Sequence, residues 1–171
     1  MALDSLKDLF LNELRDVYHA ENQLLAALPR MAEAAQSPAL RAAFTKHHAE
    51  TEVQVQRLED IFGTIGEKPG GKRCPGMEGI VEEGKEIMEE EGQEPVLDAA
   101  LIAAAQKVEH YEIAAYGCLR TYASLLGERE IAKLLDQTLA EEEATDEALT
   151  KLGEGGINQA ALAAGSAQER R

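Results

Sequence analysis

The sequence has little cysteine, no tryptophan and few aromatic residues. Its 171 residues include 2 Cys and no Trp, and Phe, Trp and Tyr together make up 4%. Cys74 and Cys118 cannot build a disulfide framework, and neither lies in a Cys-x-x-Cys motif that would hold zinc. This usage is typical of a reducing compartment, so we expect a cytoplasmic protein.

Positive charge and long apolar runs are also scarce. The chain has 17 Lys and Arg against 32 Asp and Glu, a net charge of −15. Such a balance repels phosphate groups and anionic lipid headgroups, so we expect neither nucleic acid nor membranes as partners, and we expect cations instead. No stretch approaches the roughly 18 apolar residues of a spanning helix. Asp4, Lys7 and Asp8 interrupt the N-terminal segment, which is unlike a secretory signal.

What the sequence does contain is a helical pattern along its whole length. Hydrophobic residues make up 44% of the chain, enough for a core, and they recur every three or four positions instead of alternating. We therefore predict an all-α protein, with one domain over residues 1–153 and a flexible Gly- and Ala-rich tail over 154–171. The long helices are expected over residues 3–36, 38–62, 95–126 and 128–153.

Glycine and proline gather between the second and third long helices. Residues 63–76 contain seven of these and are predicted to form a loop: Gly63, Gly66, Pro69, Gly70, Gly71, Pro75 and Gly76. A short amphipathic helix is expected next, over residues 77–91. An insert of this length can run along the whole bundle. The pattern predicts a four-helix bundle with a long crossover that carries a short extra helix between helices 2 and 3.

Ionisable residues lie on or beside the apolar stripe of every long helix, near its middle. Burying an unpaired carboxylate is costly or raises its pKa, and clustered like charges increase the cost. Neither Lys nor Arg occupies these mid-stripe positions, since Lys107 and Arg120 fall on other helix faces. The candidate metal-ligating residues are Glu21, His47, Glu50, Glu109, Glu112, Glu142 and Asp146.

The spacing of these residues suits a site for two metal ions. Residues three or four apart share a helix face, as Glu109 and Glu112 do. Hard oxygen ligands with one imidazole favour iron, with manganese as the alternative. The Glu-x-x-His motif of ferritin-like di-metal proteins is absent, because Val53 follows Glu50 and Thr145 follows Glu142 at that spacing. The predicted site is therefore rich in carboxylate and poor in imidazole.

Each candidate also has a plainer interpretation. A single Glu beside an apolar stripe is usually solvated, and a single His such as His47 is usually a structural residue of the core. The coincidence on four helices at one level is what favours the metal site.

Cys74 lies outside this candidate site. Lys72 and Arg73 precede it and would lower the pKa of its thiol, as in redox-sensitive cysteines, although we favour a structural role for Cys74.

Four segments resemble the YciE/YciF family of ferritin-like bacterial stress proteins. They are FTKHHAETEVQVQRLEDIF (44–62), KRCPGMEGIVEEG (72–84), AALIAAAQKVEHYEIAAYG (99–117) and LAEEEATDEALTKL (139–152). The resemblance covers the chain except its C-terminal tail. It implies a ferritin-like, rubrerythrin-like four-helix bundle that forms a homodimer and holds a di-metal centre.

Part of this resemblance extends to rubrerythrin itself. Glu109-x-x-Glu112 followed by Tyr116 is similar to the motif of rubrerythrin's third helix, and Glu21 matches the Glu of its first helix. Rubrerythrin's histidines on helices 2 and 4 and its Cys-x-x-Cys iron-sulfur domain have no counterpart here. We expect a stress-related di-iron carboxylate protein that reacts Fe(II) with O2 or peroxide. The alternative is a non-enzymatic helical dimer that acts as a binding or structural module.

Overall fold

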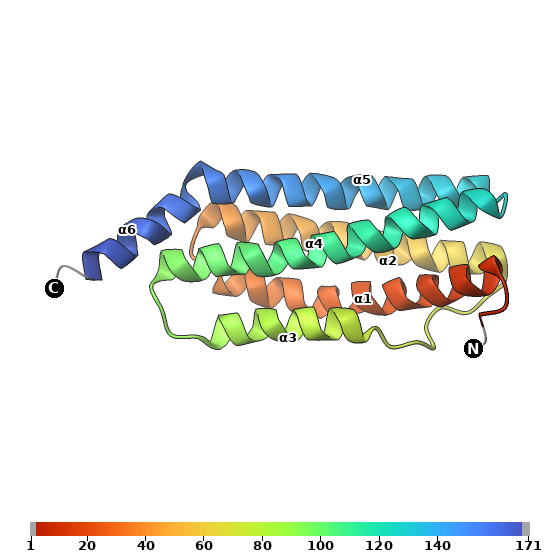
Figure 1. Ribbon diagram of the computed structural model, residues 1–171, viewed down its shortest axis with the longest axis horizontal. Helices are drawn as coiled ribbons and strands as arrows, with labels where there is room; N and C mark the ends of the chain where they lie inside the picture. The colour runs from red at the N-terminus through yellow and green to blue at the C-terminus, as the bar shows by residue number, and fades with distance from the viewer. Residues whose placement is uncertain (1–2, 169–171) are drawn as a thin grey trace.

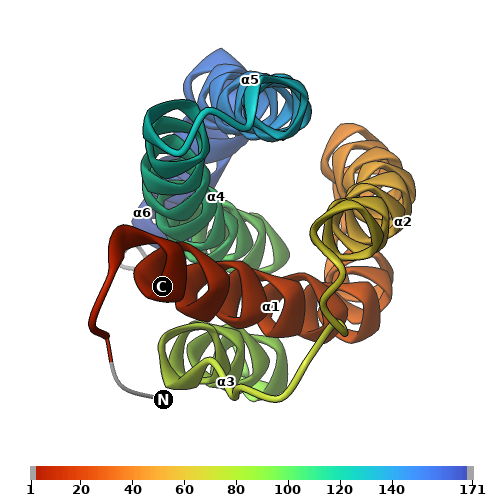
Figure 2. The ribbon, with the colours of Figure 1, turned by 90° about the vertical axis from the view of Figure 1, so that its right-hand side faces the viewer.

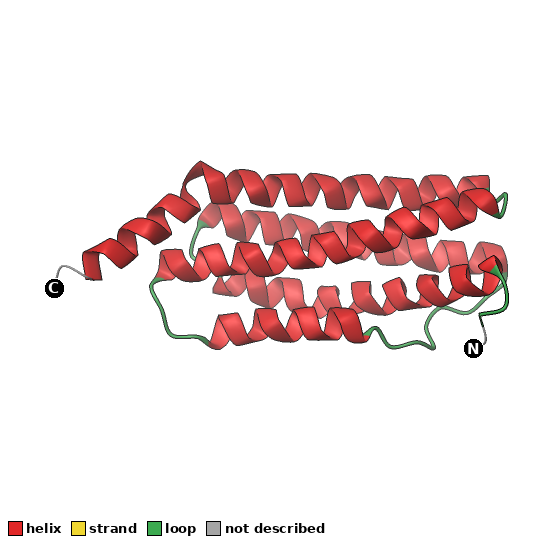
Figure 3. Ribbon diagram, in the orientation of Figure 1, coloured by secondary structure: helices red, strands yellow, loops and turns green. Residues whose placement is uncertain are grey.

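The computed structural model describes residues 3–168, and within that range every regular element is helical. The all-α prediction is confirmed (Figure 3). The elements are α1 (Leu6–Ala34), α2 (Pro38–Ile65), α3 (Pro75–Glu89), α4 (Glu94–Leu125), α5 (Arg129–Leu152), a π-helical turn (Gly153–Ile157) and α6 (Asn158–Gln168). No helix in the described part of the chain is both long enough and apolar enough to span a membrane.

Four of these helices, α1, α2, α4 and α5, form a bundle. Short turns join α1 to α2 and α4 to α5, so each pair is an antiparallel hairpin (Figure 1). The connection from α2 to α4 carries the chain back along the bundle, and α2 and α4 therefore run in the same direction. Within this connection, α3 packs on the outside against α1 and α4 (Figure 2). The predicted crossover with its extra helix is confirmed.

Helix starts follow the capping residues of the sequence. The Ser37 hydroxyl accepts a hydrogen bond from the Leu40 amide at 3.4 Å, and Pro38 occupies the first turn of α2, where its missing N–H costs nothing. Pro75 starts α3 in the same way, two residues before the predicted start. At the end of α2, Gly66 has a φ of 73°, a left-handed conformation that glycine adopts without strain.

Asp98 connects the two hairpins at one end of the bundle. It is buried near the start of α4, and its carboxylate accepts hydrogen bonds from the backbone amides of Gln36 at 2.8 Å and Ser37 at 2.7 Å. Those amides belong to the turn between α1 and α2. A charge-assisted bond of this kind holds the first hairpin in register with the second.

The apolar core consists of two separate clusters along the bundle. One includes Leu24, Phe44 and Val108, and the other includes Val17, Leu58 and Tyr116. On every bundle helix, the residues between the two clusters are the ones that carry the ionisable side chains predicted from the sequence. The polar layer is therefore enclosed by apolar packing on both sides along the bundle axis.

The C-terminal segment is helical where we expected a flexible tail. Gly156, with a φ of 153°, marks a kink in the π-helical turn, and α6 then continues and packs against α4 (Figure 1). Its alanine content explains the difference, because alanine has the highest helix propensity. Residues 169–171 of the expected tail lie outside the described residues. The domain boundary at residue 153 stays a prediction.

Candidate metal centre

Four ionisable side chains meet in the polar layer between the two core clusters. His47 comes from α2, Glu109 and Glu112 from α4, and Glu142 from α5. One ligand atom of each lies within 4.8 Å of the ligand atoms of the others. None of the four residues is more than 2% exposed. We call these four residues the metal-binding group.

Glu21 adds a carboxylate from α1, so all four bundle helices contribute to the polar layer. It is fully buried, and its Oε1 accepts a hydrogen bond from the hydroxyl of Tyr116. Burial raises the pKa of Glu21 well above its ordinary value, and the charge of Glu142 raises it further. Glu21 is thus electrostatically linked to the metal-binding group.

Two threonines border the metal-binding group without satisfying its carboxylates. The hydroxyl of Thr51 donates to the backbone oxygen of His47 at 3.0 Å, and that of Thr145 donates to the backbone oxygen of Glu141 at 3.1 Å. Each hydroxyl thereby uses its single proton within its own helix. These short side chains also occupy little of the volume between the helices.

The polar layer contains buried atoms that make no hydrogen bond within the described part of the chain. Buried polar groups in proteins are nearly always paired, so a concentration of unpaired atoms at one place requires a cause. Most of these atoms are carboxylate oxygens, which need a positive partner. They include Glu21 Oε2, both ring nitrogens of His47, Glu109 Oε2, both oxygens of Glu112, and Glu142 Oε2.

The protonation states follow from burial and mutual repulsion. Burial raises the pKa values of Glu109 and Glu112 well above the ordinary range, with added repulsion from Glu142 and Glu21 respectively. Burial also raises the pKa of Glu142, to about 7. Without metal, protons must therefore occupy some of these carboxylates at neutral pH.

His47 is neutral in this environment. Burial lowers its pKa to about 4, and the charges of Lys46 and His48 act in the same direction. Its Nε2 lies 3.4 Å from Glu109 Oε1 and 3.9 Å from Glu142 Oε2. A neutral imidazole beside carboxylates is the form that binds a metal ion, and this donor set fits iron or manganese.

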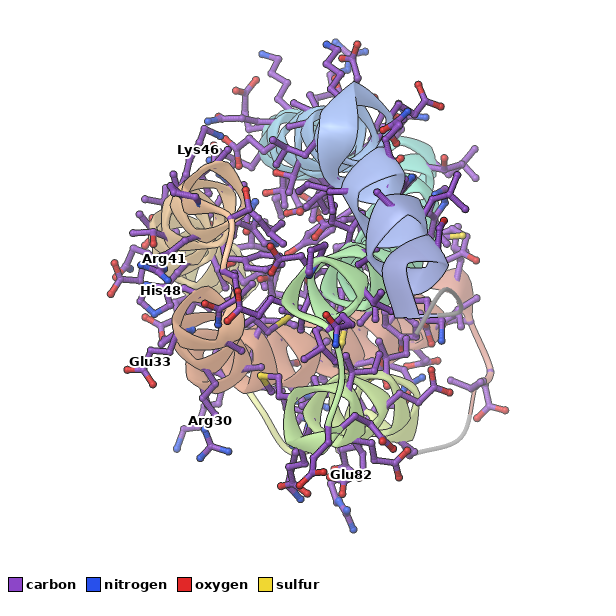
Figure 4. All side chains as sticks on the ribbon, turned by 90° about the vertical axis from the view of Figure 1, so that its left-hand side faces the viewer. Arg30, Glu33, Arg41, Lys46, His48 and Glu82 are labelled. Carbon is purple, nitrogen blue, oxygen red and sulfur yellow. The ribbon has the colours of Figure 1, made fainter. Side chains whose placement is uncertain are left out.

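The structure does not bring Glu50 and Asp146 into the metal-binding group. Glu50 Oε1 pairs with Lys46, a residue at the periphery of the bundle in Figure 4, and the Glu50 side chain is 28% exposed, although its Oε2 is buried and has no hydrogen-bond partner among the described residues. Asp146 accepts a hydrogen bond from Gln106 at 3.3 Å and lies 3.5 Å from His110 Nε2. Residues three or four apart share a helix face only approximately, and both side chains lie at its edge.

Arg57 is the buried residue that the sequence pattern did not reveal. It is 7% exposed, and its guanidinium binds both carboxylate oxygens of Glu141 at 2.9 and 3.0 Å. Arg57 does not occupy a mid-stripe position, but its long side chain, next to Leu58, reaches into the bundle and bonds to residues of α5, which spacing alone does not reveal. Gln54, one turn before Arg57 on α2, is fully buried and donates to Glu142 Oε1.

Cys74 belongs to a different buried network, between α1, α3 and α4. Its Sγ lies 2.9 Å from the hydroxyl of Tyr111, which donates to Asp16 at 2.7 Å. Burial raises the pKa of the Cys74 thiol, and the hydrogen bond to Asp16 adds to the effect. Lys72 binds Asp16 at 3.0 Å and Arg73 binds Glu78, so neither produces the lowered pKa of a redox-sensitive cysteine.

Comparison with known proteins places the whole bundle in one family. The model of the family described as Domain of unknown function (DUF892) matches residues 5–162. The chain belongs to the DUF892 family. It is 45% identical to Protein YciF of Escherichia coli strain K12 over 162 residues. This alignment covers 94% of this chain and 98% of YciF. The resemblance to the YciE/YciF family is confirmed.

Several solved structures share the fold. The crystal structure of the E. coli stress protein YciF matches with a TM-score of 0.87 at 46% identity, over 91% of this chain and 98% of YciF. YcfI from Rhodopseudomonas palustris, whose description suggests a structural role, matches with a TM-score of 0.84 at 42% identity. The match covers 86% of this chain and 94% of YcfI. A Xanthomonas campestris protein matches with a TM-score of 0.73 over 92% of this chain and 95% of its own. At 20% identity, this match shows a shared fold alone.

Proposed function

We propose that this DUF892 protein is a di-metal carboxylate protein whose resident metal is iron, with manganese as the alternative. The observation that carries the proposal is the set of buried, unpaired carboxylate oxygens around the neutral imidazole of His47. The proposed ligands are Glu21, His47, Glu109, Glu112 and Glu142. Glu50, whose Oε1 pairs with Lys46 while its Oε2 is buried and unpaired, and Asp146, which lies beside His110, are not among the residues whose ligand atoms converge, and we leave both outside this set.

Charge balance supports two ions. Glu21, Glu109, Glu112 and Glu142 carry four negative charges when ionised, and two divalent cations supply four positive charges. Cations can therefore replace the protons that the raised pKa values require, which removes the main electrostatic penalty of the polar layer.

Iron held by these residues would supply one-electron chemistry with O2 or peroxide, so the proposed protein would act as an oxidoreductase on Fe(II). The chain's own residues prepare the site for it. Tyr116 holds one oxygen of Glu21, His47 offers a neutral nitrogen, and the two apolar clusters limit the access of water along the bundle axis. The description of the relative YciF as a stress protein supports a protective use.

Metal analysis of the purified protein tests this function. After anaerobic loading with Fe(II), we expect two ions per chain in the wild type and a loss of at least one in Glu112→Gln. The matched control is Glu143→Gln on α5, because Glu143 is exposed and should bind no metal. Peroxide-dependent oxidation of Fe(II) should fall together with the metal content. Full metal content and activity in Glu112→Gln would contradict the assignment.

The second candidate is a non-enzymatic helical dimer that acts as a structural or binding module. The structural role suggested in the description of YcfI favours it. A colourless protein that binds no metal and remains thermally stable would support this candidate over the first. The homodimer is common to both, and analytical ultracentrifugation tests it.

A further inference from the structure

A chain of hydrogen bonds runs from a charged residue of α2 to a ligand oxygen on α5. The guanidinium of Arg57 binds both oxygens of Glu141, at 2.9 and 3.0 Å, and also donates to the hydroxyl of Thr138. The Nε2 of Gln54 donates to Glu141 Oε2 at 3.2 Å and to Glu142 Oε1. One amide group therefore connects the ion pair to the metal-binding group.

This chain separates the solvent from the metal-binding group on one side of the bundle. Arg57 and Glu141 line a groove of about 310 Å³ between α2 and α5. Side-chain exposure is 25% for Glu141 and 8% for Arg57, and Gln54 behind them is fully buried. A largely buried ion pair contributes little net stability because its desolvation offsets the attraction. The conformational stability of the bundle alone does not account for an arginine here.

The Arg57–Glu141 pair determines which end of the Gln54 amide faces Glu142. An amide side chain can present either its NH2 group or its oxygen, and only the NH2 group can donate to a carboxylate. Glu141, held at both oxygens by Arg57, accepts from the same Nε2 and selects that orientation. The oxygen of Gln54 has no hydrogen-bond partner within residues 3–168, so it does not help to fix the amide.

The two oxygens of Glu142 are consequently in different situations. Oε1 accepts the hydrogen bond from Gln54. Oε2 lies 3.9 Å from His47 Nε2 and accepts from no N–H or hydroxyl donor of the described residues; its carboxyl neighbour Glu109 forms a hydrogen bond with Glu142 only when one of the two carries a proton, which a metal ion would displace. We propose that Arg57 is a positioning residue which, through Glu141 and the Gln54 amide, holds Glu142 so that Oε2 is the oxygen offered to a metal ion. This inference rests on the proposed function, since it assigns Glu142 as a ligand.

Cobalt binding in four variants tests the proposal, because Co²⁺ has a visible spectrum that depends on its ligands. The variants are Arg57→Gln, Gln54→Leu, the double variant, and the control Arg120→Gln. Arg120 makes a comparable bond to Asp136 at 2.9 Å between α4 and α5, but on the exposed surface. Affinity is measured by competition with a chelator, and circular dichroism checks that each variant is folded.

Each single variant at the site should bind Co²⁺ roughly 10–100-fold more weakly and change its spectrum, as loss of a partner behind a metal ligand does elsewhere. The double variant should be no weaker than Gln54→Leu alone, because Arg57 acts through Gln54. Arg120→Gln should match the wild type. Arg57→Lys keeps the charge and loses the bidentate contact, so its Co²⁺ affinity should lie between those of the wild type and Arg57→Gln. It serves as a milder variant if Arg57→Gln does not fold.

If the wild-type protein binds metal, the proposed function is supported, and two results would then overturn only the positioning role of Arg57. One is an unchanged affinity and spectrum in folded Arg57→Gln or Arg57→Lys. The other is an additive loss in the double variant, which would show that Arg57 does not act through Gln54. A folded wild-type protein that binds neither Co²⁺ nor Fe²⁺ would overturn the proposed function and this inference together.

Discussion

Tyr116 on α4 donates its hydroxyl hydrogen bond to Glu21 on α1, and both side chains are completely buried. The bond crosses from the second hairpin to the first at the level of the polar layer. It also leaves Glu21 Oε2 as the unpaired oxygen of that carboxylate. The same arrangement holds for Glu142, where Gln54 occupies one oxygen and the other is unpaired.

Tyr116→Phe should therefore weaken both folding and metal binding. The buried Glu21 oxygen loses its donor, which should lower the free energy of unfolding by about 1–3 kcal/mol. Metal affinity should fall roughly 10-fold or more, since a ligand loses the group that orients it. Urea denaturation and chelator competition measure the two effects. Tyr18→Phe is the matched control, because Tyr18 bonds to Glu59 on the surface, and a loss as large there would contradict the argument.

Metal-free protein should become less stable as the pH rises from about 5 to 8. The folded state raises the pKa values of four buried carboxyls, to about 7 for Glu142, and lowers the pKa of His47 to about 4. The four carboxyls outweigh the one imidazole, so the folded state binds more protons than the unfolded chain. The stabilisation is complete below the ordinary Glu pKa of 4.5 and is lost as the pH passes through the raised value. Thermal unfolding with chelator present measures this. Glu142→Gln or added metal should flatten the dependence, whereas a melting temperature that rises over this interval would refute it.

Gly76→Ala should destabilise the attachment of α3. A Cβ at this position would lie 2.8 Å from Tyr111 Cε2, and the Tyr111 hydroxyl is held by Cys74 and Asp16. The ring cannot withdraw without breaking those bonds, so we expect a loss of about 1–3 kcal/mol in urea unfolding. Gly79→Ala on the same helix meets nothing within 4 Å and should gain up to about 1 kcal/mol from helix propensity. Equal effects of the two substitutions would show that the contact with Tyr111 is unimportant.

The two cysteines should react with Ellman's reagent at very different rates. Cys118 is exposed, whereas Cys74 is buried and the pKa of its thiol is raised. In native protein at neutral pH we expect one fast thiol per chain and a second that reacts only on unfolding. Cys118→Ser should abolish the fast phase and leave the slow one. A fast phase that survives in Cys118→Ser would show that Cys74 is a reactive thiol after all.

The sequence was sufficient for the fold because its determinants are local. Apolar spacing marked the helices, and α2 begins at the expected residue Pro38 but runs to Ile65, three residues beyond the expected end. The interior position of Glu21 and Glu112 was also predictable, since a carboxylate that interrupts an apolar stripe must enter the core with it. Their role as ligands stays a prediction.

Other parts of the site depend on tertiary geometry. Glu50 lies close enough in sequence to His47 to share its helix face, yet Lys46 and the edge of that face keep it outside the group. Arg57 was missed because its burial depends on Glu141 and Thr138 of another helix, which no spacing on α2 reveals. Long side chains can cross between stripes, and a stripe defines only the direction in which a short side chain points.

The residues of the polar layer are divided between the hairpins, with Glu21 and His47 on one and Glu109, Glu112 and Glu142 on the other. Neither half of the polypeptide can offer all these donors by itself, so the complete donor set of the proposed site forms only after both halves have come together during folding. Ions held there would act as a cross-link between distant stretches of chain, slowing the separation of the halves. A newly made chain would thus be protected from loading iron before it has finished folding.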